Sequence, residues 1–268
     1  MRSLLKADFF ALLKSKLTYV VLFICLGFPI LMVLIDLGLA KVIVDVSQEF
    51  EGEMPLSISD MFSGKGIIFS AFNLTQNIGL IIPIFVGIIT MTDIRNGTIR
   101  NKVIIGKNRT QIYLSHLIVS MAFCVGMIFI SFLMFFGMSS MFFKYGTEVN
   151  GAAVLDFFKC LVIGLLTFVY VASLSTFLAL STKSMPLTII VTLVTVLVLS
   201  IACAFLPLLP TDKYNYIFYM IPTYATTRLG STELLPNDVF WFGLGSYLVF
   251  SALNSVLGIL IFNKTDLK

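Results

Sequence analysis

A basic stretch at residues 93–111 contains the side chains best suited to bind a phosphate or a protein partner. A nucleotide-binding P-loop needs the pattern G-x-x-x-x-G-K-[ST], because its backbone amides cradle the phosphates and its hydroxyl reaches magnesium. Here Gly106-Lys107 is followed by Asn108, and Asn101 stands where the first glycine should be. We therefore predict that the chain binds no cofactor, hydrolyses no nucleotide and is not an enzyme.

The same stretch predicts a short helix. Asn96-Gly97 is a turn signal, Thr98 could cap the following helix and Gly106 could end it. About two turns of helix would carry an apolar face opposite Arg100. The residues of that face are Ile99, Val103 and Ile104. Such a helix, joined rigidly to two membrane spans, would act as a lever for a partner; a basic loop that only sets topology is the alternative.

Polar side chains also recur at helical spacing inside long apolar segments. Polar groups at membrane depth are costly and often mark a transport pathway. The candidate pathway residues are Asn73, Gln76, Asn77, Thr192 and Asn254. Hydrogen bonding between helices, commonly worth about 1 kcal/mol or less per contact, would account for the same residues. Both interpretations stay open, and none of these side chains is ionisable.

The sequence predicts no metal site. Its four cysteines have no paired spacing, and its one histidine, His116, lies at the edge of an apolar segment. Metal-binding or disulfide frameworks show C-x-x-C or Cys/His clusters, which this sequence does not contain. We expect the cysteines to pack as small apolar residues and His116 to have a structural role.

Composition places all these residues in a membrane protein. Of the 268 residues, 58% are hydrophobic and only 12% charged, against about 25% charged in soluble domains. Six apolar blocks are long enough to cross a hydrocarbon layer as helices. They are Leu17–Leu39, Ile67–Thr92, Ile112–Phe136, Val154–Leu180, Leu187–Leu208 and Val239–Phe262. We predict one all-α transmembrane domain over residues 1–268.

The distribution of basic residues predicts the orientation. Most of the 18 lysines and arginines lie before the first block, in the second and fourth connections, and after the last block. Because cytoplasmic loops are enriched in these residues, both termini are expected in the cytoplasm.

Two segments are expected to lie at the membrane surface. Residues 1–16 place leucines and phenylalanines at helical spacing among cations, which predicts an interfacial helix. It serves either as an anchor for the first span or as an elbow that also braces a neighbouring subunit. The external segment 209–238 is rich in tyrosine and contains Pro222, which is compatible with a re-entrant hairpin or with an ordinary loop.

These features together resemble the permease subunit of type 2 ATP-binding-cassette exporters. The resemblance rests on the amphipathic start, six spans with both ends inside, and the run D-I-R-N-G-T-I-R-N-K-V-I-I-G-K-N-R-T-Q-I-Y-L-S from Asp93. In that family an acidic residue precedes Gly-Thr, a short coupling helix and an Arg. These positions are occupied here by Asp93, Gly97, Thr98 and Arg109. Two residues depart from the family pattern: Asp93 stands where Glu is commoner, and His116 stands where relatives often have Lys.

The resemblance implies a transport function that depends on other chains. The coupling interface would comprise Asp93, Gly97, Thr98, Ile99, Lys102, Val103 and Arg109. A separate cytoplasmic ATPase would bind ATP and magnesium, and a second permease chain, identical or homologous, would complete the pathway in a bacterial plasma membrane. The cargo would be apolar or amphipathic, such as a peptide, lipid or drug. The partners would include membrane lipid but no nucleic acid. The alternatives are a secondary transporter and a non-transporting membrane partner or sensor.

Overall fold

The computed structural model describes residues 1–49, 64–74, 81–143, 151–205, 215–229 and 234–264. Within these ranges every regular element is helical, as the composition predicts. The helices are α1 (Arg2–Lys14), α2 (Lys16–Glu49), α4 (Gly64–Ser70), α5 (Ile81–Arg95), α6 (Thr98–Ile104), α7 (Arg109–Phe142), α8 (Gly151–Thr182), α9 (Met185–Phe205), α10 (Asn215–Tyr219), α11 (Tyr224–Thr227) and α12 (Asn237–Lys264).

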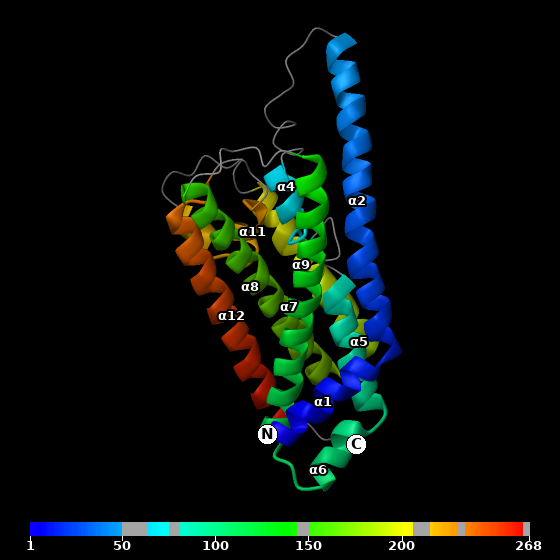
Figure 1. Ribbon diagram of the computed structural model, residues 1–268. Helices are drawn as coiled ribbons and strands as arrows, with labels where there is room; N and C mark the ends of the chain where they lie inside the picture. Colours follow the sequence, from blue (N-terminus) through cyan, green and yellow to red (C-terminus); the bar gives the residue numbers. More distant parts are fainter. Residues whose placement is uncertain (50–63, 75–80, 144–150, 206–214, 230–233, 265–268) are drawn as a thin grey trace.

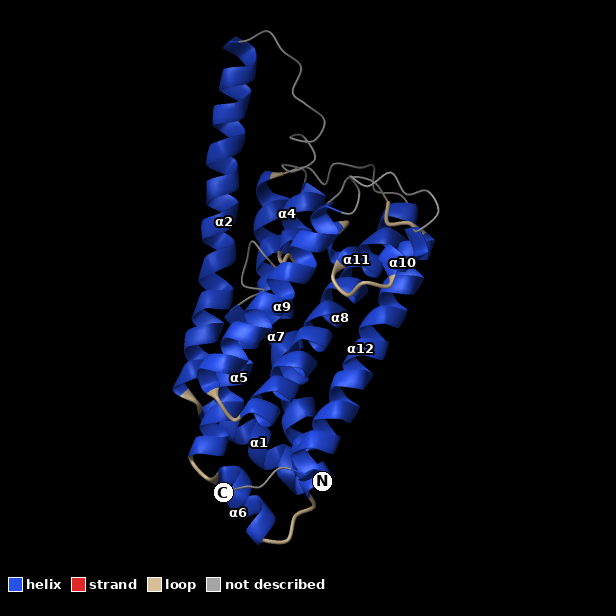
Figure 2. Cartoon of the chain, turned by 180° about the vertical axis from the view of Figure 1, so that it is seen from behind, coloured by secondary structure: helices blue, strands red, loops and turns tan. Residues whose placement is uncertain are grey.

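The long helices run side by side in one bundle (Figure 1). Five of them contain segments that are long and apolar enough to cross a membrane, so the chain is a multi-pass, all-helical membrane protein. The five segments are Lys16–Val42, Arg109–Phe142, Gly151–Thr182, Met185–Cys203 and Asn237–Lys264. Helices α1 and α6 lie at one end of the bundle, whereas α4, α10 and α11 lie at the other (Figure 2).

The predicted second span, residues 67–92, is not one continuous helix. It is divided between α4 and α5, and turn-type bonds from the Phe72 and Asn73 amides to the carbonyls of Phe69 and Ser70 end α4. The Phe72 ring is fully buried against Gly164 of α8. The described ranges contain five candidate spans, so the sixth expected span is not confirmed there.

Helix α2 is longer than its predicted span and continues to Glu49 (Figure 1). It contains Pro29, which has no backbone N–H to donate to the carbonyl of Cys25 four residues earlier. The Ser131 hydroxyl of α7 donates to that carbonyl at 3.1 Å. A polar side chain of the neighbouring helix thus satisfies the acceptor that proline leaves free, and it joins α2 to α7 at membrane depth.

Helix α8 is the centre of the bundle, since α5, α7, α9 and α12 all pack on it. Glycines allow close approach at two of the crowded contacts. A Cβ atom on Gly164 would lie 2.4 Å from the Phe72 ring, and one on Gly258 of α12 would lie 1.9 Å from the Tyr113 hydroxyl of α7. These glycines let aromatic rings press directly against neighbouring backbones.

We expect Gly164→Ala to lower thermal stability in detergent, because the added methyl group must displace the buried Phe72 ring. Overpacking of this kind costs about 1–3 kcal/mol. The matched control is Gly126→Ala on α7, where an added Cβ meets open space and alanine favours the helix by about 1 kcal/mol. Equal melting temperatures for the two variants would contradict the packing at Gly164.

Candidate functional site: a buried polar cluster between α1, α5, α6 and α7

Helix α6 is bounded by two glycines in left-handed conformations. Gly97 has φ +70° and is the N-cap residue, and Gly106 has φ +85° just after the helix ends. Because residues other than glycine rarely adopt this backbone conformation, the two glycines determine where α6 begins and ends. The expected turn at Asn96-Gly97 and the stop at Gly106 are confirmed. Thr98 is not the cap but the first helical residue, and no side-chain bond caps α6.

The apolar face of α6 packs against its own chain. Ile99 is only 1% exposed, in a small core with Leu4 of α1 and Tyr113 of α7, and Val103 packs beside it. Ile99 is therefore covered by α1 and α7 and is not accessible to a partner protein, whereas Val103 is only half-buried.

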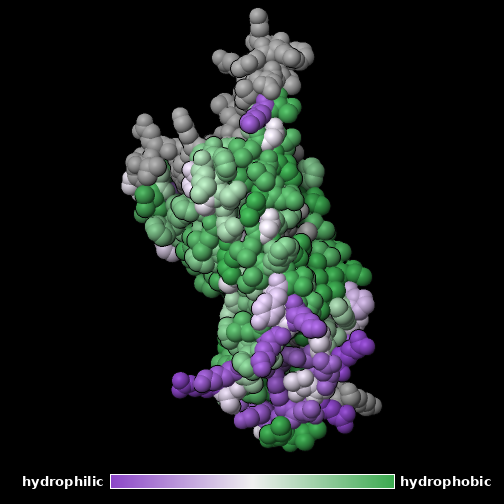
Figure 3. Space-filling view, turned by 45° about the vertical axis from the view of Figure 1, so that its right-hand side comes forward, coloured by the Kyte–Doolittle hydropathy of each residue, from purple (hydrophilic) through white to green (hydrophobic). Residues whose placement is uncertain are grey.

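Two other isoleucines are exposed instead. Ile104 is 72% exposed and Ile105 76% exposed, and they form the "isoleucine tip" of the molecule. Ile104 was expected on the face with Ile99 and Val103, but it points away from the bundle. Figure 3 shows a small hydrophobic patch at the lowest point of the molecule, beneath a belt of hydrophilic residues. Exposed apolar groups beyond a polar belt are the feature expected of a contact site.

Lys102 lies on the inward side of α6 and forms an ion pair with Asp8 of α1. The two side chains are only 13% and 6% exposed. The second carboxylate oxygen of Asp8 accepts a hydrogen bond from the Ser115 hydroxyl of α7 at 2.6 Å. A buried charge needs both a counter-charge and hydrogen bonds to be tolerated. Asp8 has both, and its carboxylate therefore joins α1, α6 and α7.

His116 extends this cluster to α5. Its Nε2 atom lies 3.3 Å from the Lys102 ammonium, and its Nδ1 atom lies 3.7 Å from a carboxylate oxygen of Asp93. An ammonium group only donates hydrogen bonds, so Nε2 must be the acceptor and the ring proton must sit on Nδ1, facing Asp93. Burial raises the pKa of Asp93 above its ordinary value; the Lys102 ammonium opposes this shift and the Asp8 carboxylate adds to it.

A cavity of about 160 Å³ adjoins these groups and is lined by Asp8, Asp93 and His116 together with hydroxyl side chains. Its volume and polar lining are sufficient for ordered water. The "polar cluster" is defined as Asp8, Asp93, Lys102, Ser115 and His116. Its two carboxylates and its imidazole line the cavity, and the Lys102 amine contacts Asp8 and His116 from α6. This arrangement can hold four helices in a fixed geometry and can move protons between neighbouring groups.

Arg109 contacts the end of α12. Its Nη1 atom donates to the Asn263 carbonyl at 3.2 Å, and the Asn263 side chain donates to the Thr110 hydroxyl at 3.2 Å. These contacts join the start of α7 to the end of α12. Of the seven residues expected at a coupling interface, Asp93 and Lys102 meet in the cluster, whereas Arg109 fastens a different pair of helices.

The candidate pathway residues that the structure describes lie on three different elements. Asn73 lies in the turn after α4, and Gln76 and Asn77 lie outside the described residues. Thr192 is buried and its hydroxyl donates to the Thr188 carbonyl of its own helix at 2.8 Å. Asn254 of α12 donates to the Ser173 hydroxyl of α8 at 3.2 Å. For Thr192 and Asn254 the contacts favour the packing interpretation.

The opposite end of the bundle contains a second buried ion pair, which the sequence patterns did not reveal. Lys65 of α4 lies 2.7 Å from Asp156 of α8, with side chains 2% and 5% exposed. The other oxygen of Asp156 accepts a hydrogen bond from the Leu235 amide at 2.7 Å. Both residues stand at the edges of apolar segments, and that position is the only signal in the sequence.

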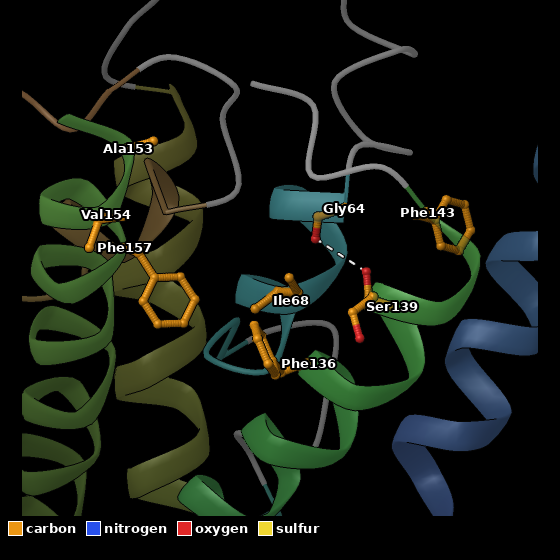
Figure 4. A pocket seen from close by; sticks show the side chains of 9 residues that line it. Gly64, Ile68, Phe136, Ser139, Phe143, Ala153, Val154 and Phe157 are labelled. Carbon is orange, nitrogen blue, oxygen red and sulfur yellow. Dashed lines mark hydrogen bonds between the residues drawn. The ribbon is translucent and has the colours of Figure 1, made fainter. Parts of the chain in front are cut away.

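An apolar cavity of about 430 Å³ lies near this pair, between α4, α7 and α8 (Figure 4). Phe136, Phe157 and Ile68 line it, and Ser139 at its edge donates its hydroxyl proton to the Gly64 carbonyl at 3.3 Å. With that hydroxyl engaged, the cavity is suited to an apolar group.

Comparison with known proteins supplies a family but no function. Residues 30–268 match the model of a family described as "Protein of unknown function (DUF2705)". The chain belongs to the DUF2705 family. A search of curated proteins and a search of solved structures found no match. The match to DUF2705 includes four of the five cluster residues and begins after α1, which carries Asp8.

We expect Asp8→Ala to destabilise this DUF2705 protein strongly, because it leaves the Lys102 ammonium buried without a counter-charge. Breaking a buried ion pair in this way costs about 3–5 kcal/mol. Thermal unfolding in detergent measures the loss. The double variant Asp8→Ala with Lys102→Met should recover much of it, since both charges are then absent.

The control is Arg100→Met, which removes an exposed cation from the same helix and should leave the melting temperature unchanged. Strictly additive effects of Asp8→Ala and Lys102→Met would show that the two side chains do not interact, contrary to the structure.

Proposed function

We propose that this DUF2705 protein is the transmembrane permease subunit of an ATP-binding-cassette exporter, driven by a separate ATPase. The observation that carries the proposal is the construction of α6. This short helix stands at one end of the bundle, exposes the isoleucine tip and is fastened to α1 and α7 by buried contacts. The resemblance of the run that begins at Asp93 supports the same conclusion.

In the proposed mechanism α6 transmits force. The isoleucine tip inserts into an apolar groove of the ATPase, and nucleotide-driven movement of the ATPase displaces α6. Ile99 passes the displacement to α7 through apolar packing, and Lys102 passes it to α1 through Asp8. The pair is buried, and separating a buried charge from its partner is strongly unfavourable, so the two helices should move together.

The proposal includes a second permease chain and an apolar or amphipathic cargo. The apolar cavity between α4, α7 and α8 supports this cargo class, because an apolar group could enter it without leaving a polar atom unpaired. In the proposed orientation the α1 and α6 end faces the bacterial cytoplasm, and α10 and α11 belong to an external or re-entrant element.

One observation favours a secondary transporter as a second candidate. Asp93 and His116 line a polar cavity, and groups of this kind can accept and release protons during transport. Transport by reconstituted vesicles distinguishes the two candidates: an exporter needs ATP and its ATPase, whereas a secondary transporter responds to an ion gradient alone.

The isoleucine tip provides the direct test of coupling. We expect Ile104→Asp with Ile105→Asp to fold and insert normally, since both side chains are exposed, but to lose co-purification with an ATPase encoded beside its gene. Placing two carboxylates in an apolar contact costs several kcal/mol, so transport should be lost as well.

The matched control is Gln111→Asp, which adds a carboxylate at another exposed position near α6. Ile99→Asp should instead destabilise the chain itself, because Ile99 is buried. Normal recovery of the ATPase with the doubly substituted tip would rule out this coupling site.

The orientation can be tested by cysteine labelling in intact cells. The four native cysteines are buried and should not react. A membrane-impermeant maleimide should label Asp238→Cys at the α4 end but reach Arg100→Cys on α6 only after the cells are opened; both native residues are exposed. Labelling of Arg100→Cys in intact cells would reverse the proposed orientation.

A further inference from the structure

The outward side of α1 borders a groove that neither the ion pair nor α6 uses. The groove lies between α1 and α7 and has a volume of about 640 Å³, within the range of about 300–1,000 Å³ that is usual for ligand sites. Its lining is almost entirely apolar and includes Leu5, Phe9 and Leu13 from α1 and Ile118 from α7. Lys6 is the charged residue that lines it.

The polar cluster leaves only positive charges on the exposed side of α1. Asp8 is the only acidic residue of α1, and it points inward to Lys102 and Ser115. The basic residues Arg2, Lys6 and Lys14 are all exposed. Lys14 remains close to the groove side of the helix, with its ammonium 4.5 Å from the centre of the Phe10 ring. The exposed side of α1 therefore presents cations alternating with large apolar side chains.

The two walls of the groove meet different environments. The wall from α7 belongs to a candidate membrane span, and Ile118 lies about 14 Å along that helix from its start. The wall from α1 lies at the level of the hydrophilic belt at the same end of the bundle (Figure 3). An occupant of this groove must have an apolar part toward α7 and a negatively charged part beside Lys6.

We propose that the groove between α1 and α7 is a binding site for an anionic phospholipid, with an acyl chain along Ile118 and the headgroup beside Lys6. Charge complementarity supports this occupant. A second copy of α1 would bring the same cations to Lys6 and be repelled. Because the lipid contacts the outward side of the helix whose inward side holds Asp8, its binding also keeps α1 in place for the ion pair with Lys102.

The test measures lipid retained by the purified chain alone, so it is independent of any ATPase partner. Native mass spectrometry compares dioleoyl-phosphatidylglycerol with dioleoyl-phosphatidylcholine at equal concentration. We expect preferential retention of phosphatidylglycerol. Lys6→Gln should weaken this retention roughly five-fold, the effect of one cation beside an anionic lipid surface. Lys107→Gln removes one charge at the same end of the molecule and should leave retention unchanged.

A second variant tests the acyl chain separately. Ile118→Trp fills the apolar part of the groove at an exposed position and should reduce retention of both lipids, whereas Leu253→Trp at an exposed position on α12 should not. Equal retention of the two lipids would overturn the proposal, and so would equal losses of retention in Lys6→Gln and Lys107→Gln. If Ile118→Trp converts a dimer to a monomer and leaves lipid retention unchanged, a second copy of the chain occupies the groove and the proposal is also overturned.

Discussion

The geometry of the end of the bundle that contains α1 and α6 depends on the ion pair between Lys102 and Asp8. An ammonium group that is nearly withdrawn from water requires a counter-charge, and the only acidic residue of α1 supplies it. The pair fixes the rotation of α6 about its own axis. With Lys102 and Ile99 turned inward, Ile104 and Ile105 must face outward. The exposed tip is thus a consequence of the buried charge, and the cationic outer side of α1 follows from the same contact.

The membrane-embedded part is held together by different means. Along the centre of the bundle, glycines of α8 and α12 admit the rings of Phe72 and Tyr113 at distances that any larger residue would forbid. Hydroxyl groups satisfy backbone acceptors that the helices leave open, as Ser131 does for Cys25. At the end of the bundle that contains α4, Lys65 and Asp156 form a second buried ion pair. Contacts of this sort suit a bundle in lipid, where apolar contact alone gives little driving force for association.

Much of the fold could be predicted from the sequence because long apolar runs must be helical in lipid. Helices α7, α8, α9 and α12 correspond to predicted spans, and Gly97 and Gly106 correctly marked the limits of α6. The division of the second span could not be predicted, since it depends on the fit of Phe72 against a glycine of α8. Helical spacing grouped Ile99, Val103 and Ile104, but it could not show whether the chain's own helices would cover that face. Asp8 gave no sign of its role, because its partners lie far along the sequence.

The separation of Asp8 and Lys102 also governs the order of events during synthesis. Asp8 is made 94 residues before its partner. At about 5–20 residues per second, α1 waits on the order of 5–20 s before its counter-charge exists. During that interval the carboxylate has no counter-charge and needs water, so α1 cannot complete its docking before α6 has been made. Docking of α1 is then a late step of biogenesis, and it reports that α5, α6 and α7 have reached their places.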